Sequence, residues 1–332
     1  MSSRLNPVAA VCHRRSLVPA VTDRRCGMIL ALLLLLSLFA GRLPALDSEL
    51  APLAARTLLL DVARAGSRLV AVGDRGHVLL SDDEGRTWQQ VVVPTRAMLT
   101  GVSFRDDQHG CAVGHDGVIL TTADGGRQWT RQAADADVDT VFLDVTLDAP
   151  STGVAVGAYG KCLLTTDAGK SWQPAAPIPD EVHINQAVSV SGTLFLAGEA
   201  GTLLASSDPA KAWRKLDVPY EGSFFGVLPL DAGFLLAYGL RGNVFVSTDA
   251  GTTWNSRPVP VPVLLMAAVK MKSGAIVLAG LGGNFFISRD GATAFQHWQP
   301  AEYNGGVSSL LEAADGALVV VGENGAARLT VP

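Results

Sequence analysis

Six aspartates occupy the same place in a recurring segment, Ser/Thr-x-Asp-x-Gly-x-x-Trp, which we call the aspartate motif. Carboxylates at such fixed spacing could form six sugar or metal sites. Alternatively, each could accept backbone N–H groups and stabilise its own turn. A ligand site is not expected to repeat identically, so the structural role is favoured. The six residues, with degraded motifs around the fourth and sixth, are Asp83, Asp124, Asp167, Asp208, Asp249 and Asp290.

The alternative to a structural role is catalysis, and glycoside hydrolysis is the reaction to consider. A sialidase-type enzyme needs a Tyr nucleophile with a Glu partner, an acid Asp and an arginine cluster, and no arginine triad is evident. Hydrolysis by two carboxylates could use Asp61 with Asp144, or Glu199 with Asp116, at separations that the sequence does not fix. We therefore expect no catalytic residue and keep a hydrolase as the alternative. The four tyrosines are Tyr159, Tyr220, Tyr238 and Tyr303.

A second motif, Gly-x-x-Gly, precedes each aspartate motif and occurs once more at the end of the chain. Its seven copies are spaced by 41 to 43 residues. Self-similarity at this period indicates a solenoid, an array or a propeller. The first glycines are Gly73, Gly114, Gly157, Gly198, Gly239, Gly280 and Gly322.

Each repeat contains four short runs rich in Val, Leu, Thr and Phe, bounded by turn residues. Such runs are typical of strands. Four antiparallel strands in each of seven repeats predict an all-β fold, a seven-bladed β-propeller over residues 46–332. The repeats begin near residues 58, 98, 141, 184, 223, 264 and 307.

The seventh repeat stops after its third strand. We expect residues 48–54 to supply the missing fourth strand by pairing with residues 326–331. This mature N-terminal strand would close the ring and remove an open sheet edge.

Residues within the Gly-x-x-Gly turns differ from blade to blade, and variation on a repeated frame is where function usually resides. These turns should share one face of the disc with the links between blades. We predict that this face binds a partner, and that no residue holds a metal or cofactor. The predicted partner-binding residues are Arg75, His77, His115, Asp116, Tyr159, Lys161, Glu199, Arg241, Asn243, Asn284, Glu323 and Asn324.

The innermost strands place mostly small residues at one equivalent position around the axis. Asp61 and Asp144 are exceptions, and they could hold a cation or ordered water in the channel. The position is occupied by Asp61, Gly101, Asp144, Ala187, Gly226, Ala268 and Leu310.

Residues 1–45 are typical of a secretory signal peptide. An apolar run at residues 28–40 follows Arg14, Arg15, Arg24 and Arg25. About 20 residues are needed to span a bilayer as a helix, so an uncleaved anchor is the weaker alternative. We expect an exported, periplasmic protein, in which Cys111 and Cys162 could pair or remain as core residues.

Composition excludes further classes. With 48 % hydrophobic residues the chain can bury a core. Beyond residue 45 it carries 20 basic against 30 acidic groups, so nucleic acid is not expected as a partner. A quinone-dependent dehydrogenase is not supported, because the calcium-binding acids that it requires are not located.

The paired motifs, with Ala-Val-Gly-x-x-Gly at residues 71–76, 112–117 and 155–160, resemble those of the photosystem II stability/assembly factor family. The aspartate motif alone also occurs in sialidases, sortilin-like receptors and xyloglucanases. The resemblance implies a lumenal or periplasmic propeller that escorts a membrane-protein precursor without catalysis. It would be peripheral to the membrane through its partner, and we expect a monomer. Photosynthetic members carry an arginine-rich partner face, where this chain has only Arg75 and Arg241.

Overall fold

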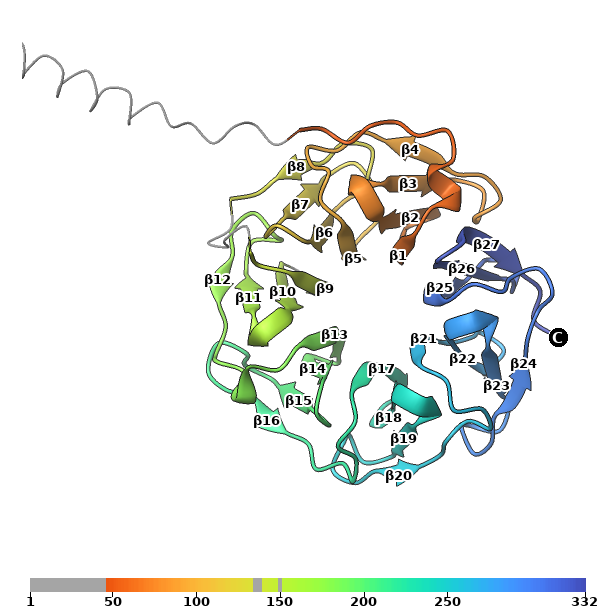
Figure 1. The fold of residues 1–332 in the computed structure, drawn as a ribbon. Coiled ribbons are helices and arrows are strands. Elements are labelled where there is room, and N and C mark those ends of the chain that lie inside the picture. The colour runs from red at the N-terminus through yellow and green to blue at the C-terminus, as the bar shows by residue number, and fades with distance from the viewer. Residues whose placement is uncertain (1–45, 134–138, 149–150) are drawn as a thin grey trace, which may run out of the picture. The chain divides into compact units, whose positions relative to one another are not determined.

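Seven small β-sheets surround a central axis in the computed structural model (Figure 1). The structure describes residues 46–133, 139–148 and 151–332. Ala45–Pro332 forms one compact unit. The predicted all-β, seven-bladed β-propeller is confirmed, whereas the predicted signal peptide at residues 1–45 lies outside the described residues. Within the described ranges, no helix is long and apolar enough to cross a membrane.

Each blade is an antiparallel meander whose first strand lies nearest the axis. The first three blades consist of β1 (Leu59–Ala65), β2 (Arg68–Gly73), β3 (Val78–Ser81), β4 (Gln89–Val91); β5 (Leu99–Phe104), β6 (Gly110–Gly114), β7 (Ile119–Thr122), β8 (Thr130–Arg131); and β9 (Phe142–Asp148), β10 (Thr152–Gly157), β11 (Cys162–Thr165), β12 (Gln173–Pro174). The fourth and fifth consist of β13 (Ile184–Val190), β14 (Thr193–Gly198), β15 (Leu203–Ser206), β16 (Arg214–Lys215); and β17 (Phe224–Asp231), β18 (Phe234–Gly239), β19 (Val244–Ser247), β20 (Asn255–Ser256). The last two consist of β21 (Leu265–Lys270), β22 (Ile276–Gly280), β23 (Phe285–Ser288), β24 (Gln296–Trp298); and β25 (Val307–Glu312), β26 (Leu318–Gly322), β27 (Gly325–Leu329).

Short 3-10 segments occur mainly in the turns between second and third strands. Four of them coincide with Gly-x-x-Gly turns: η2 (Asp74–Gly76), η3 (Ala158–Gly160), η5 (Leu240–Gly242) and η6 (Leu281–Gly283). The other two, η1 (Ala54–Arg56) and η4 (Pro179–Glu181), lie in segments that lead into first strands.

The hydrophobic core is divided into seven clusters, one between each pair of neighbouring blades. The cluster between the first two blades, for example, packs Val70 and Val72 against Val102 and Trp129. Another joins the last blade to the first and includes Val319 and Leu69. Stability therefore rests on contacts between nearest neighbours, as in other repeat folds.

The two cysteines face different blade interfaces and remain unpaired. Cys111 packs between the second and third blades, and Cys162 between the third and fourth. The body of the third blade thus separates them. Burial raises the pKa of both thiols, that of Cys162 to about 12, so they are protonated core residues.

Every innermost strand carries a β-bulge at the same level. In each blade one residue of the first strand is skipped in the register with the second strand, a geometry that re-aims the side chain of the extra residue. The seven bulge residues are Leu60, Thr100, Leu143, Asn185, Phe225, Met266 and Ser308.

The predicted closure by residues 48–54 is wrong. The sheet of the seventh blade has three strands, and residues 46–58 contain no strand. Ser48 instead bonds to Val93 just beyond β4, on the outer edge of the first blade. The chain then passes β27, where a Cβ on Gly325 would lie 2.0 Å from the carbonyl oxygen of Ala55. The turn Ala54–Arg56 covers this part of the edge without pairing with it.

Side chains join the two ends of the ring on the face opposite the Gly-x-x-Gly turns. Glu84 binds Arg64 through two hydrogen bonds of 2.8 and 2.9 Å and accepts the backbone N–H of Ala314 at 2.8 Å. Arg328 of β27 donates to the carbonyl oxygen of Glu84 and binds Asp315 at 2.7 Å. We call these five residues the seam network.

Candidate functional site

The Gly-x-x-Gly turns and the links between blades share one face, which we call the turn face. In all seven blades the N–H after the first glycine donates to a carbonyl of the preceding link, as Ala158 does to Val141 at 2.9 Å. A Cβ on Gly157 would lie 2.0 Å from the same carbonyl oxygen, so only glycine allows this approach. The turns are therefore rigidly attached to the frame.

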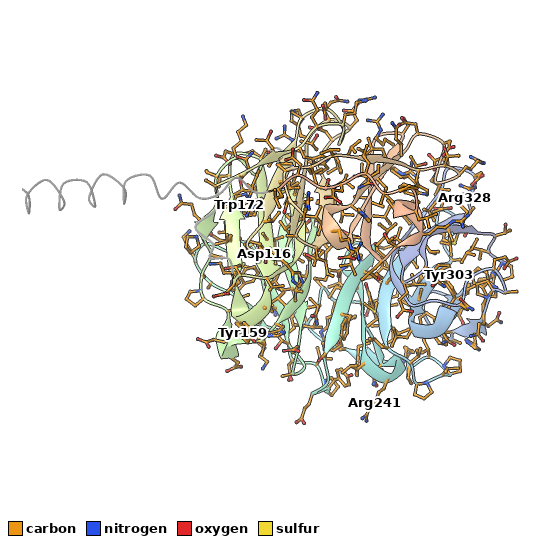
Figure 2. The ribbon with its side chains drawn as sticks, turned by 45° about the horizontal axis from the view of Figure 1, so that its top comes forward. Asp116, Tyr159, Trp172, Arg241, Tyr303 and Arg328 are labelled. Atoms are coloured by element: carbon orange, nitrogen blue, oxygen red, sulfur yellow. The ribbon has the colours of Figure 1, made fainter. Side chains whose placement is uncertain are left out.

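Side chains project from these turns at a residue in the left-handed conformation. Arg75, Asp116, Tyr159 and Arg241 have φ angles between 54° and 57° and are exposed. A side chain in this conformation is strained relative to glycine. Figure 2 shows Tyr159 and Arg241 near the lower edge of the view, away from Trp172 and Arg328. The turn face thus holds prominent side chains at a conformational cost.

Tyr159 is the most exposed large aromatic side chain that the structure describes, at 76 %. Its ring meets that of His183 edge-on, with centroids 4.7 Å apart and planes at 83°. The Nδ1 atom of His183 lies 3.8 Å from Glu199 Oε2. An apolar ring held upright beside polar groups is the kind of residue that anchors protein interfaces. His183 had not been predicted for this site, because it lies in a link rather than in a turn.

The charges on this face are mixed. Arg75 lies 3.5 Å from its neighbour Asp74, and its side chain is 81 % exposed. Arg241 is exposed, and Lys161 is half-buried. Asp116, in the turn of the second blade, is exposed and adds an acidic side chain to this face.

Several predicted partner-binding residues are engaged within the molecule instead. His77 is 3 % exposed, its Nδ1 lies 3.0 Å from Thr57 Oγ1, and burial lowers its pKa. His77 therefore offers little free surface to a partner. The amides of Asn243 and Asn284 donate to carbonyls of their own turns at 2.8 and 2.7 Å. They are better explained as turn-stabilising residues.

In the seventh blade the turn residues are exposed and also tied to the preceding link. Glu323 accepts the N–H of Gly306 at 2.7 Å, and Asn324 donates to Asn304 at 3.0 Å. His115 is half-buried and faces the axis of the ring, where it lines the central cavity.

The aspartate motifs lie on the opposite face, and their carboxylates are used by their own turns. Asp83 Oδ1 accepts the Ser81 hydroxyl and the N–H of Thr87, both at 2.8 Å. The Thr87 hydroxyl, which donates to Asp83 Oδ2 at 2.6 Å, and these two bonds together lower the pKa of Asp83 to about 2. Asp124, Asp167, Asp249 and Asp290 make the same two kinds of bond.

Asp208 departs from this pattern. The Ser206 hydroxyl donates to Ala212 instead of to the aspartate, and Asp208 pairs with Lys211 at 2.5 Å. Its expected role as a turn acceptor is therefore corrected: this turn is held by serine and by an exposed ion pair.

The tryptophans of the intact motifs pack between blades as expected. Trp129, Trp172 and Trp254 are buried, and each donates to the carbonyl of the motif glycine at 2.8 to 3.2 Å. Trp88, beside the seam network, has a buried indole N–H without a protein acceptor among the described residues.

Asp61 and Asp144 lie on the inner wall and connect neighbouring blades. Asp61 Oδ2 accepts the N–H of Val102 at 2.8 Å, and Asp144 Oδ2 accepts that of Ala187 at 2.9 Å. The other oxygen of each accepts the N–H of the next residue at 2.8 Å. Burial raises the pKa of both carboxyls, and the charge of Asp61 raises that of Asp144 further.

The predicted alignment around the axis is wrong in three blades, as the pairing of the first strand with the second shows. Gln186 Oε1 accepts the N–H of Val227 at 2.7 Å, just as the aspartates bind the next blade. The predicted residues Ala187, Ala268 and Leu310 each follow the residue that occupies this level in their strand. The residues at this level are Asp61, Gly101, Asp144, Gln186, Gly226, Ala267 and Ser309.

A cavity of about 360 Å³ occupies the part of the axis nearest the turn face. All seven bulge residues line it, together with Asp61, Asp144 and Met98. Within the described part of the chain, no group of three or more His, Cys, Asp or Glu residues could hold a metal ion.

A family model described as photosynthesis system II assembly factor YCF48 matches residues 80–140 and 132–326. Over 93 residues the chain is 33 % identical to the photosystem II stability/assembly factor HCF136, chloroplastic, of Cyanidioschyzon merolae. That match covers 26 % of this chain and 21 % of the relative, so the chain spans about a fifth of that protein's length.

Solved structures show the same fold at low identity. YCF48 bound to D1 peptide has a TM-score of 0.70 and 19 % identity, covering 88 % of this chain and 98 % of that one. YCF48 from Cyanidioschyzon merolae has a TM-score of 0.69 and 17 % identity, covering 85 % and 98 %. The WD40 propeller of Doa1 has a TM-score of 0.66 and 14 % identity, covering 87 % and 97 %.

Proposed function

Because the chain belongs to the photosynthesis system II assembly factor YCF48 family, we propose that it is a non-enzymatic scaffold that binds a membrane-protein precursor segment and assists its assembly. The solved relative bound to D1 peptide supports a peptide-like ligand of this class. We further propose that the protein acts as an exported, periplasmic monomer that is peripheral to the membrane through its partner.

The observation that carries the proposal is the set of strained, exposed turn residues on a rigid frame. Backbone strain that the surroundings maintain is often found at functional sites. Tyr159 would be the central anchor, because its ring is 76 % exposed and already oriented by His183. A side chain ordered before binding loses little entropy when a partner covers it.

Charge would guide the partner without dominating its affinity. Arg75, in the turn between β2 and β3, and Arg241, in the turn between β18 and β19, belong to a face that also carries Asp116. A contact of mixed charge should weaken with salt without being abolished.

The geometry also favours a binding role over glycoside hydrolysis. Tyr238 and Tyr303 are buried, and the hydroxyl of Tyr220 donates to Leu240 at 3.3 Å. Tyr159 is exposed on a turn that projects from the surface, whereas catalysis needs a site that encloses its substrate. These features support the non-enzymatic assignment.

Capture of the partner from the host's own membranes tests the proposal. The protein should recover a membrane-protein precursor, identified by mass spectrometry, and the combined variant Arg75→Glu, Tyr159→Ala, Arg241→Glu should not. A matched triple variant on the opposite face, Arg127→Glu, Gln128→Ala, Lys170→Glu, should capture as the wild type does. Loss of capture only in this second variant would show that the partner binds the face of the aspartate motifs and not the turn face.

Cell fractionation tests the proposed location. A tagged full-length protein should appear in the periplasmic fraction, in part attached to membranes. Loss of the attached fraction in the first triple variant, but not in the second, would link attachment to the turn face.

A further inference from the structure

The central cavity opens among residues of the turn face. Met98, from the link before the second blade, and His115, from a Gly-x-x-Gly turn, belong to its lining. Its volume of about 360 Å³ lies near the lower end of the roughly 300–1,000 Å³ typical of ligand pockets. It can therefore receive one or two side chains, but not a folded segment.

Four of the seven bulge residues in the lining are apolar, and the other three, Thr100, Asn185 and Ser308, are polar and uncharged. Leu60, Leu143, Phe225 and Met266 all line the cavity, and Met98 adds a second thioether. Each of these side chains is half-buried, so each keeps surface that a ligand can cover. Methionine adapts its shape to different alkyl groups.

Two carboxyl groups lie beside this apolar ring. Asp61 and Asp144 directly follow the bulge residues Leu60 and Leu143 and also line the cavity. Each carboxylate has about four acceptor positions, and two backbone N–H groups, joined at Asp61 by the Ser309 hydroxyl, occupy only part of them. The lining contains no Lys or Arg, and its other titratable groups are His115 and Tyr238.

We propose that this cavity receives a basic side chain, a lysine or arginine, from the segment bound at the turn face. An alkyl stem matches the ring of Leu, Met and Phe, and a cationic head matches the two carboxylates. An anion would meet two acids without a Lys or Arg in the lining. A wholly apolar group would offer the two carboxylates neither a positive charge nor a hydrogen-bond donor. The raised pKa of Asp144 fits this role, since an entering cation favours the charged carboxylate.

This inference extends the proposed function, but it can be tested without the partner. The probe is Nα-acetyl-lysine methylamide, titrated into protein with ¹³C-labelled methionine methyl groups. Met98 and Met266 should shift saturably. Met271, buried at 6 % exposure between the last two blades, should not. The norleucine analogue, which has the stem but no ammonium, and the glutamate analogue should bind at least about tenfold more weakly.

Two variants complete the test. Asp144→Asn should weaken the lysine probe by about tenfold and leave the norleucine analogue unchanged. Leu143→Lys places an ammonium beside Asp144 and should abolish probe binding in a folded protein, as judged by an unchanged Met271 signal. Equal binding of lysine and norleucine analogues, or no saturable shift of Met98 and Met266, overturns the proposal. So does undiminished probe binding by Leu143→Lys.

Failure of this inference differs from failure of the proposed function. Probe binding without capture of a precursor would retain the cavity site and reject the scaffold role. Capture without probe binding would do the reverse.

Discussion

Ser48 and Val93 exchange two hydrogen bonds at the edge of the first blade. The N–H of Ser48 donates to the Val93 carbonyl at 2.8 Å, and Ser48 Oγ accepts the N–H of Val93 at 2.9 Å. Both residues are buried, with exposures of 5 % and 1 %. The N-terminal segment is thereby fixed to the first blade, on a sheet edge that already has four strands.

The first prediction concerns this pair. Ser48→Ala removes the acceptor of a buried N–H and should lower the free energy of unfolding by about 1 to 3 kcal/mol. Glu49→Ala, in which only an exposed ion pair with Arg96 is lost, should change it by less than about 0.5 kcal/mol. Urea denaturation of both variants provides the comparison. Equal effects would mean that the segment does not hold the blade.

The second prediction concerns the seam network and acid. Glu84 has its pKa lowered to about 2 from an ordinary value of 4.5, chiefly by its bonds with Arg64. Its contribution to stability is therefore complete above pH 4.5 and is lost as the pH falls toward 2. Glu84→Gln should be less stable than the wild type at pH 7, and the difference should shrink at pH 2 to 3.

Urea denaturation at these pH values measures that difference. Glu302→Gln, a change of an exposed glutamate, is the control and should follow the wild type throughout. A difference between Glu84→Gln and wild type that is independent of pH would show that the network contributes through packing rather than charge.

The third prediction contrasts an intact aspartate motif with a degraded one. Asp124→Ala removes the acceptor of Thr122 and Gln128 and should cost about 1 to 3 kcal/mol. Asp208→Ala should change the melting temperature little, because it removes an exposed ion pair with Lys211. Neither variant should alter capture of the partner. If both variants lost equal stability, the hydrogen bonds of the turn would not explain the motif.

The repeats made the fold predictable because two motifs mark two different turns of each blade. The closure was not predictable from them, because an open sheet edge can be covered or bridged by side chains without being paired with a strand. The turn Ala54–Arg56 lies against part of β27, and the hydrogen bond from Arg328 to Glu84 joins the two ends of the ring. These side chains belong to no repeated pattern.

The bulge residues that line the cavity were missed for a different reason. A bulge adds one residue to a strand without changing the repeat length, so the sequence does not reveal which residue faces the axis. The position of His77 within its repeat also suggested an exposed side chain, whereas the side chain is buried. His77 aligns with Lys161, Asn243 and Asn284, but it is buried and its Nδ1 lies within hydrogen-bond distance of Thr57 Oγ1.

The last prediction separates stability from binding at the turn face. Arg241 has a φ of 56°, which a glycine adopts without strain and a β-branched residue tolerates poorly. Arg241→Gly should therefore unfold at the same temperature as the wild type or a higher one, and Arg241→Val at a lower one. Capture of the membrane partner should nevertheless weaken in both variants, because each lacks the guanidinium. If Arg241→Gly kept full capture, the arginine would have no role in binding, and the partner would have to be recognised through Tyr159 and the rest of the face.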